Sequence, residues 1–221
     1  MVKVKQFVCN SFGENTYILY DETGECVIID AGCYQAKEEI RLKNFIDTQS
    51  LFPKFLIQTH GHIDHILGAA FVCKTWKIPF CVHSADNYLL VNVLQQSRMF
   101  GFEAPPVPGI DMDLALQSSL HFGNTEIFLI PTPGHSPGGV CLHLSSEKIL
   151  FSGDVLFAGS IGRTDLFGGD YDQLMESIHN KLLILDPETR VYPGHGYITT
   201  LGEELAENPF LLRPGSSENT F

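Results

Sequence analysis

The feature that most constrains this chain is a short segment, residues 59–65 (THGHIDH), in which three histidines and one aspartate fall within seven positions. So many candidate metal ligands in so short a run are hard to explain as packing. Neutral imidazole nitrogens and a carboxylate oxygen suit zinc or a related first-row metal. Because the segment directly follows the apolar run 55–57, we expect it at the carboxyl end of a strand.

Composition excludes several other kinds of protein. The 221 residues carry 14 Lys+Arg against 26 Asp+Glu, a net charge of -12, and no segment gathers the basic residues into a stripe that could follow phosphates. We therefore expect no nucleic-acid partner. No apolar run approaches the roughly 18 residues that a membrane span needs. The six cysteines form no C-x-x-C pair and the N-terminus leads into no hydrophobic signal segment, so we expect a reduced, cytoplasmic protein.

Strand-like and helical patterns alternate along the chain, as in an α/β fold. The first three strands, separated by turn signals, suggest an antiparallel meander. We expect residues 1–212 to form one domain and the Pro-, Gly- and Ser-bearing tail 213–221 to be frayed. The expected strands are 2–8, 16–20, 26–30, 54–58, 78–82, 126–130, 140–144, 148–151 and 190–192, and the expected helices are 35–48, 66–77, 84–99 and 171–185.

Residues 84–110 are open to two interpretations. Ser84 and Asp86 are typical of a helix start, whereas 100–110 is rich in Pro and Gly and is expected to be a long loop. The apolar side chains of Tyr88, Phe100 and Phe102 fit either a substrate lid or a subunit interface. The oligomeric state stays open for the same reason.

Three further strand-end turns each carry one candidate ligand: His135 in 132–139, Asp154 in 152–154 and His195 in 193–196. Turns at the ends of strands hold side chains in fixed directions. We therefore expect the four segments to build one site. Glycines 134, 153, 194 and 196 beside these ligands are expected to allow tight turns with positive φ near a metal.

These motifs together resemble the metallo-β-lactamase superfamily. The segment THGHIDH matches its H-x-H-x-D-H signature, and PGHSPGG, SGDVLF and YPGHG follow in the same order, over about residues 2–210. The segments GDVLFAGSIGRTD and YPGHGYITTLGEE are similar to the glyoxalase II (hydroxyacylglutathione hydrolase) group in a short single-domain form. The resemblance implies an α/β fold, a four-layer αββα sandwich of two mixed sheets flanked by helices, with metals at one edge.

The resemblance also implies roles for particular residues. Asp64 and Asp154 would be the catalytic carboxylates, and Asp154 would bridge two zinc, iron or manganese ions. Arg163 and Tyr197 would bind substrate; on sequence alone an ion pair of Arg163 with Asp165 or Asp170 is as good an interpretation. The implied ligands are His60, His62 and His135 for the first metal and Asp64, His65 and His195 for the second.

The implied reaction is thioester hydrolysis by a metal-bridging hydroxide, with S-D-lactoylglutathione giving D-lactate and glutathione. A thiolate leaves without a general acid, and these motifs offer no obvious one, which favours a thioester over an amide or β-lactam. Two alternatives stay open. One is a mononuclear iron persulfide dioxygenase using His60, His135 and Asp154, and the other is a small-ester or lactone hydrolase.

Overall fold

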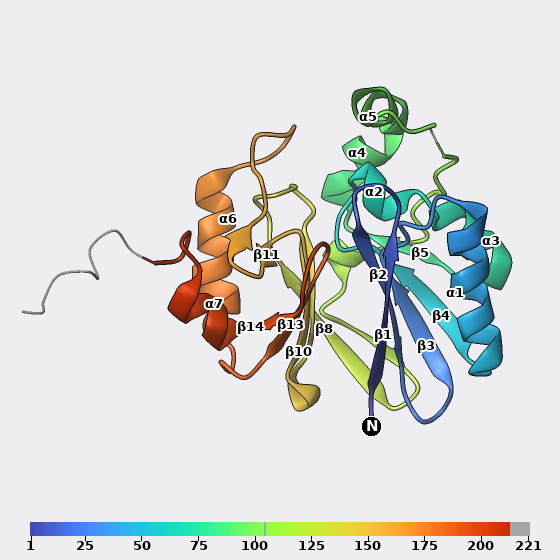
Figure 1. Cartoon of the computed structure of the whole chain (residues 1–221), viewed down its shortest axis with the longest axis horizontal. Helices are drawn as coiled ribbons and strands as arrows, with labels where there is room; N and C mark the ends of the chain where they lie inside the picture. Colours follow the sequence, from blue (N-terminus) through green and yellow to red (C-terminus); the bar gives the residue numbers. More distant parts are fainter. Residues whose placement is uncertain (104, 213–221) are drawn as a thin grey trace, which may run out of the picture.

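The computed structural model describes residues 1–103 and 105–212, so the expectation for the tail 213–221 lies outside the described residues. Two six-stranded sheets pack face to face, and helices cover both outer faces (Figure 1). This is the four-layer α/β architecture that the sequence resemblance implies. No helix in the described ranges is both long and apolar enough to cross a membrane.

The first sheet has the order β1-β2-β3-β4-β5-β6. The expected antiparallel meander is confirmed in β1 to β3, and from β3 onward neighbouring strands are parallel. Parallel neighbours place their carboxyl ends at the same edge, and their connections must cross over the sheet. The strands are β1 (Lys3–Cys9), β2 (Glu14–Tyr20), β3 (Glu25–Ile29), β4 (Phe52–Ile57), β5 (Phe80–Val82) and β6 (Met112–Asp113).

The second sheet has the order β14-β13-β10-β9-β8-β7 and is antiparallel except where β10 pairs with β13. A separate two-stranded hairpin follows β10. The strands are β7 (Ser119–Phe122), β8 (Thr125–Pro131), β9 (Val140–Leu144), β10 (Ile149–Gly153), β13 (Arg190–Pro193) and β14 (Thr199–Thr200), with β11 (Leu156–Phe157) and β12 (Ser160–Ile161) in the hairpin.

Alternation along the central strands produces three apolar layers. On β2, Tyr17 and Leu19 belong to the core between the two sheets, whereas Ile18 belongs to the core beneath the helices of the first sheet. On the second sheet, Phe151 points into the core between the sheets and Leu150 into the third core. Strands that are buried on both faces explain why these runs are apolar throughout rather than alternating with polar residues.

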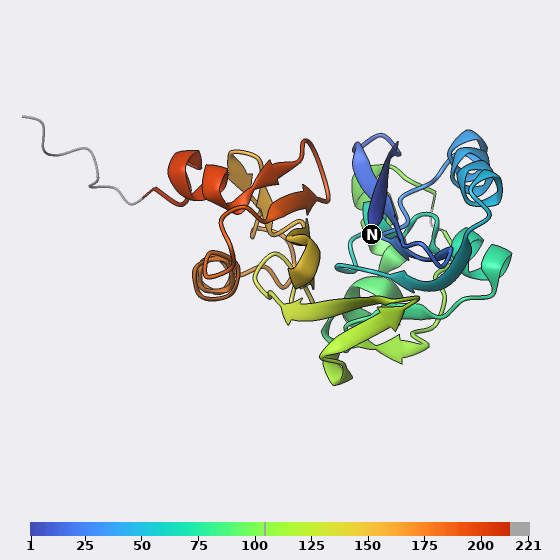
Figure 2. The ribbon, with the colours of Figure 1, turned by 90° about the horizontal axis from the view of Figure 1, so that it is seen from below.

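The outer layers are built by helices, most of which connect parallel strands. α1 (Ala36–Thr48) and α3 (Ala69–Trp76) lie against the first sheet, and α6 (Tyr171–Ser177) and α7 (Leu201–Glu207) against the second (Figure 2). A π-helical segment, Ile178–Leu182, continues α6. α7 begins at a capping box formed by Thr200 and Glu203, a local signal that the sequence interpretation missed.

Two expected helices differ from the structure. The helix expected over 66–77 is two helices, because a short α2 (Ile63–Ile66) begins inside the ligand-rich segment and α3 begins only at Ala69. The helix expected over 84–99 is interrupted at Asn92, whose φ of -100 and ψ of 22 are not helical. It consists of a 3-10 turn (Ser84–Asp86), α4 (Asn87–Val91) and α5 (Val93–Phe100).

Candidate metal centre

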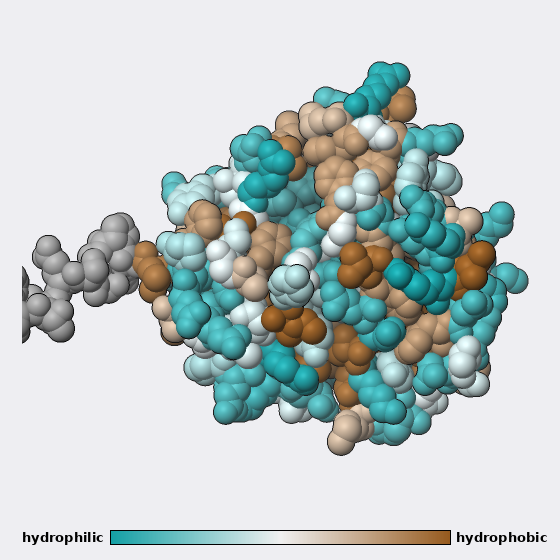
Figure 3. Space-filling model, in the orientation of Figure 1, coloured by the Kyte–Doolittle hydropathy of each residue, from teal (hydrophilic) through white to brown (hydrophobic). Residues whose placement is uncertain are grey.

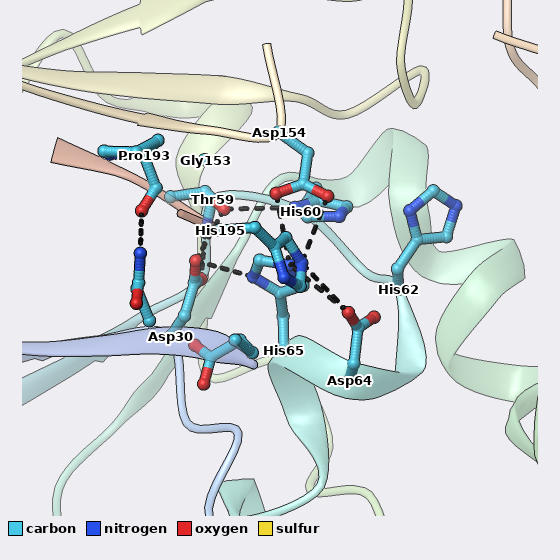
Figure 4. Close-up of polar contacts among 12 residues, drawn as sticks. Asp30, Thr59, His60, His62, Asp64, His65, Gly153, Asp154, Pro193 and His195 are labelled. Atoms are coloured by element: carbon cyan, nitrogen blue, oxygen red, sulfur yellow. Dashed lines mark hydrogen bonds and ion pairs between the residues drawn. The ribbon is translucent and has the colours of Figure 1, made fainter. Parts of the chain in front are cut away.

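Four loops at strand ends bring all seven predicted ligands together, and Figure 4 shows all of them except His135. The strands are β4, β8, β10 and β13, whose ends meet at one edge of the paired sheets. Asp64 and His65 lie in the first turn of α2 rather than in an irregular turn. Of the seven ligands, four follow β4: His60, His62, Asp64 and His65. The other three follow β8, β10 and β13 in turn: His135, Asp154 and His195.

The ligand atoms form two groups with Asp154 between them. His60, His62 and His135 offer nitrogens within 4.8 Å of one another, and the ligand atoms of Asp64, His65 and His195 are equally close. The Asp154 carboxylate reaches both groups: Oδ1 lies 3.4 Å from His65 Nε2, and Oδ2 lies 3.6 Å from His135 Nε2 and 3.5 Å from His195 Nε2. This is the arrangement in which one carboxylate can bridge two ions.

Backbone carbonyls orient two of the histidine rings. His135 Nδ1 donates to the carbonyl of Arg163 at 2.7 Å, and His195 Nδ1 donates to the carbonyl of Phe12 at 3.2 Å. A carbonyl can only accept, so Nδ1 carries a proton in both rings and Nε2 is the nitrogen that faces the centre. Metal-binding histidines in proteins are commonly fixed in this way.

Asp30 orients the other side of the site, and the sequence interpretation missed it. Its Oδ2 lies 2.9 Å from His65 Nδ1 and accepts from Thr59 Oγ1 at 2.8 Å, while Oδ1 accepts from the Thr59 amide at 2.7 Å. Since the Thr59 hydroxyl donates to Asp30, it can accept from His60 Nδ1 at 3.1 Å. One signal could have found this residue: Asp30 directly follows β3, the parallel neighbour of β4, so both strands end at the same edge.

Asp86 is a second residue whose role the sequence did not reveal. Its Oδ2 accepts from the Gly61 amide and the Ser136 hydroxyl, both at 2.8 Å, and its Oδ1 accepts from the Gly138 amide at 2.6 Å. The sequence suggested only a helix cap for Asp86. In the structure this buried carboxylate ties the ligand loop after β4 to the loop after β8.

The residues present fit a metal. His60 Nε2 and Asp154 Oδ1 are buried, and neither has a hydrogen-bond partner among the described residues. His62 Nδ1 also faces His135 Nε2 at 2.9 Å. Buried polar atoms without partners are costly, and ions bound at this place would satisfy them. Imidazole nitrogens with carboxylate oxygens accept zinc, iron or manganese.

The protonation states of the metal-free site also suit ion binding. Burial lowers the pKa of His60 well below its usual range and that of His62 to about 3, so both rings are neutral. Burial opposes ionisation of Asp64 and Asp154, but the neighbouring histidines, His65 foremost, together outweigh it and lower both pKa values. Burial likewise opposes protonation of His65, yet the carboxylates of Asp154 and Asp64 raise its pKa well above the usual value. An ion binding to His65 must therefore displace a proton.

The glycines beside the ligands fulfil two different requirements. Gly134, Gly153 and Gly196 have positive φ, as expected from the sequence. The expectation is wrong for Gly194, which is not among the residues with positive φ. A Cβ there would lie 2.2 Å from Asp154 Oδ1 and 2.7 Å from His65 Cε1, so Gly194 provides space for two ligands.

A cavity of about 190 Å³ adjoins the ligands, and the two proposed substrate residues lie differently relative to it. Arg163 lies at its edge, but its Nε and Nη2 each donate to the Asp165 carboxylate at 2.7 Å, so the ion-pair interpretation describes its present state. Tyr197 is 85% exposed and is not among the residues that line the cavity. The lining consists of Phe12, His62, Asp64, Phe100, His135, Asp154, Arg163, Leu166 and His195.

Comparison with known proteins identifies the family to which this chain belongs. A family model described as the metallo-beta-lactamase superfamily matches residues 10–195. The chain belongs to the metallo-β-lactamase superfamily. The fold and the His-rich site are those expected for a member of this superfamily of metal-dependent hydrolases.

Relatives within the superfamily carry different names. The chain is 35% identical over 213 residues to the hydroxyacylglutathione hydrolase GloC of Haemophilus influenzae, covering 91% of this chain and 94% of that protein. It is similar to the structure of the BLEG-1 B3 metallo-beta-lactamase, with 39% identity, a TM-score of 0.88 and coverage of 95% and 99%. It is also similar to TTHA1623 in a di-iron-bound form, with 35% identity, a TM-score of 0.81 and coverage of 94% and 100%.

Proposed function

We propose that this protein is a dinuclear metal hydrolase of thioesters, acting on S-D-lactoylglutathione or a related glutathione conjugate. The observation that carries the proposal is the position of Asp154, whose carboxylate lies within 3.6 Å of imidazole nitrogens from both groups of three candidate ligands. Two ions close together need a shared anion to offset their repulsion, and Asp154 is placed to supply it. The likeness to GloC and to a di-iron-bound protein supports the same proposal.

In this proposal the protein holds the reacting groups and the ions supply the electrophile. Two bound divalent ions would lower the pKa of a coordinated water and polarise the substrate carbonyl. Asp64 and Asp154 offset the charge of the ions, and Asp30 keeps His65 in the orientation that directs Nε2 at the centre. The adjoining cavity leaves room for a substrate beside the ligands.

A thioester suits the site better than an amide. The described residues that line the cavity include no lysine, tyrosine or cysteine that could protonate a departing amine. A thiol has a pKa of about 8.5 and leaves as a thiolate without such help. The lining therefore favours a substrate whose leaving group needs no proton.

The test is hydrolysis of S-D-lactoylglutathione by zinc-loaded protein, followed through loss of the thioester absorbance. We expect turnover above background that is lost in His62→Ala and retained in His121→Ala, a matched change at an exposed histidine on β7. Equal rates in the wild type and in His62→Ala would sink the proposal. The same preparation assayed with a chromogenic β-lactam tests the activity named for BLEG-1.

A mononuclear iron persulfide dioxygenase is the second candidate. Its supporting observation is that two imidazoles and a carboxylate, those of His60, His135 and Asp154, face the same part of the site. Such a set leaves open positions on iron for O₂. Uptake of O₂ with glutathione persulfide, together with one iron per chain, would favour this candidate over the hydrolase.

A further inference from the structure

A second, apolar pocket of about 100 Å³ opens beside the candidate metal centre. It lies between α4 and α5 on one side and the loop carrying Leu166 and Phe167 on the other. It shares His62, Phe100 and Leu166 with the cavity at the ligands, so the two spaces lie next to each other. Hydrophobic side chains gather where α4 and α5 lie (Figure 3).

The outer wall of this pocket is an aromatic pair. The rings of Tyr88 and Phe167 stack with centroids 4.1 Å apart and an interplanar angle of 26°. Both side chains are exposed, at 43% and 63%. The pair joins α4 to the loop between β12 and α6, so two segments distant in sequence enclose the same apolar space.

The polar groups of the buried wall are already engaged. Gln96 Oε1 accepts from the Ile63 amide at 3.0 Å, and its Nε2 donates to the carbonyl of Leu89 at 2.8 Å. No Lys, Arg, Asp or Glu is among the described residues that line the pocket. The pocket thus offers no counter-charge, and a charged group that entered it would lose hydration without compensation.

This charge pattern decides which part of a thioester can enter. The glutathione portion carries carboxylates and an ammonium group, which the apolar walls cannot pair. An uncharged acyl chain has no charge to desolvate when it enters the pocket, and each buried methylene stabilises the complex. The carbonyl at its head would then lie in the cavity at the metal ligands, since the two spaces share a wall at His62.

We propose that this pocket binds the acyl group of the substrate and that the enzyme prefers apolar acyl chains of medium length over the small, hydroxylated lactoyl group. The inference rests on the proposed hydrolase function, because it assumes that a carbonyl reacts at the ligand cluster. It concerns a specificity pocket, in which Tyr88, Met99 and Phe167 contact the chain and take no part in the reaction.

The test measures binding rather than turnover. Butanoate and hexanoate, carboxylates of the kind that hydrolysis releases, are titrated calorimetrically into zinc-loaded protein. Burying a methylene is worth about fourfold in affinity, so two added methylenes should tighten Kd by roughly 15-fold. In Phe167→Ala and Tyr88→Ala we expect the ratio of the butanoate Kd to the hexanoate Kd to fall below about threefold. Phe128→Ala, which removes an exposed ring on β8, should leave it unchanged.

The outcomes separate this inference from the proposed function. A Kd that does not depend on chain length overturns the specificity pocket, and so does a chain-length ratio that both pocket variants retain. Absence of thioester turnover, by contrast, would overturn the proposed hydrolase without changing the carboxylate ratio. A preference for hexanoate of roughly 15-fold that is lost only in the pocket variants, together with thioester turnover, supports the inference.

Discussion

Asp30 binds no metal in the proposed centre, yet its carboxylate holds His65 and Thr59 at the same time. Asparagine at this position would keep the shape but replace one acceptor oxygen with an NH₂ donor. It could then serve only some of the three contacts. The orientation of His65 would be lost, because nothing else among the described contacts reaches its Nδ1.

We therefore expect Asp30→Asn to weaken zinc binding by about 10- to 100-fold, the usual effect of losing a residue that orients a ligand. Competition with a chromogenic chelator measures the affinity. Asp47→Asn is the matched control, since Asp47 is exposed and only pairs with Lys43. Unchanged zinc affinity in Asp30→Asn would show that the contact to His65 is not needed.

Glu14 is a fully buried carboxyl group beside the ligands, and its protonation predicts a pH effect. Oε2 accepts from Thr16 Oγ1 at 2.8 Å, and Oε1 has no partner among the described residues. Burial raises the pKa of Glu14 well above its usual value, although nearby His65 opposes the shift. The folded protein therefore holds a proton that the unfolded chain releases above about pH 4.3.

Because the folded state binds one more proton than the unfolded state, the free energy of unfolding falls as pH rises, by up to about 1.4 kcal/mol per pH unit. Glu14→Gln cannot titrate. In metal-free protein, the free energy of unfolding of Glu14→Gln minus that of the wild type should rise between about pH 4.5 and 6. Urea unfolding measures it, with exposed Glu126→Gln as control. A flat difference would mean that Glu14 is ionised in the fold.

At the scale of elements, the junction between β13 and His195 leaves no room for an added side chain. The Gly194 amide donates to the carbonyl of Gly153 at 2.8 Å, and its carbonyl accepts from the Asn15 amide at 2.7 Å. The segment is therefore held from both sides and cannot move away from a new side chain.

Gly194→Ala should displace Asp154 and His65, because the added Cβ would lie 2.2 Å from one and 2.7 Å from the other. We expect hydrolysis to fall by about 100-fold, as a 1 Å error in position can cause, together with loss of bound metal. Gly109→Ala is the control, since no atom lies within 4 Å of its Cβ and its φ is not positive. Full activity in Gly194→Ala would contradict the crowding argument.

Elements differed in how far the sequence predicted them. The long strands and α1 were predicted because periodic apolar residues run through each of them. The two-residue strands β11, β12 and β14 are too short to show any period, and Asn92 gives no sequence signal for the break between α4 and α5. The ligand segments were found because each is a compact local motif.

The residues that hold the ligands were missed for a different reason. Asp30 contacts Thr59 at a separation of 29 residues, and Asp86 contacts Gly138 at a separation of 52. Each is a single acid after an ordinary apolar run. Their role appears only once β3, β4 and β8 are placed at one edge, and this depends on the packing of the two sheets.

In the whole molecule, the core between the sheets links the two halves of the site. Tyr17 on the first sheet packs against Phe151 and Tyr192 of the second, and its hydroxyl donates to the carbonyl of Pro193 at 2.7 Å. Pro193 ends the strand that leads to His195. The ligands from β4 and from β13 are thus fixed relative to each other through the core.

The central claim is that Asp154 lies between two ion sites, and the number of divalent ions per chain tests it most directly. Elemental analysis of the reconstituted wild type and of Asp154→Ala provides that number. The proposed centre predicts two ions per chain in the wild type and no more than one in Asp154→Ala. A single ion per chain in the wild type, or two ions retained without Asp154, would contradict it.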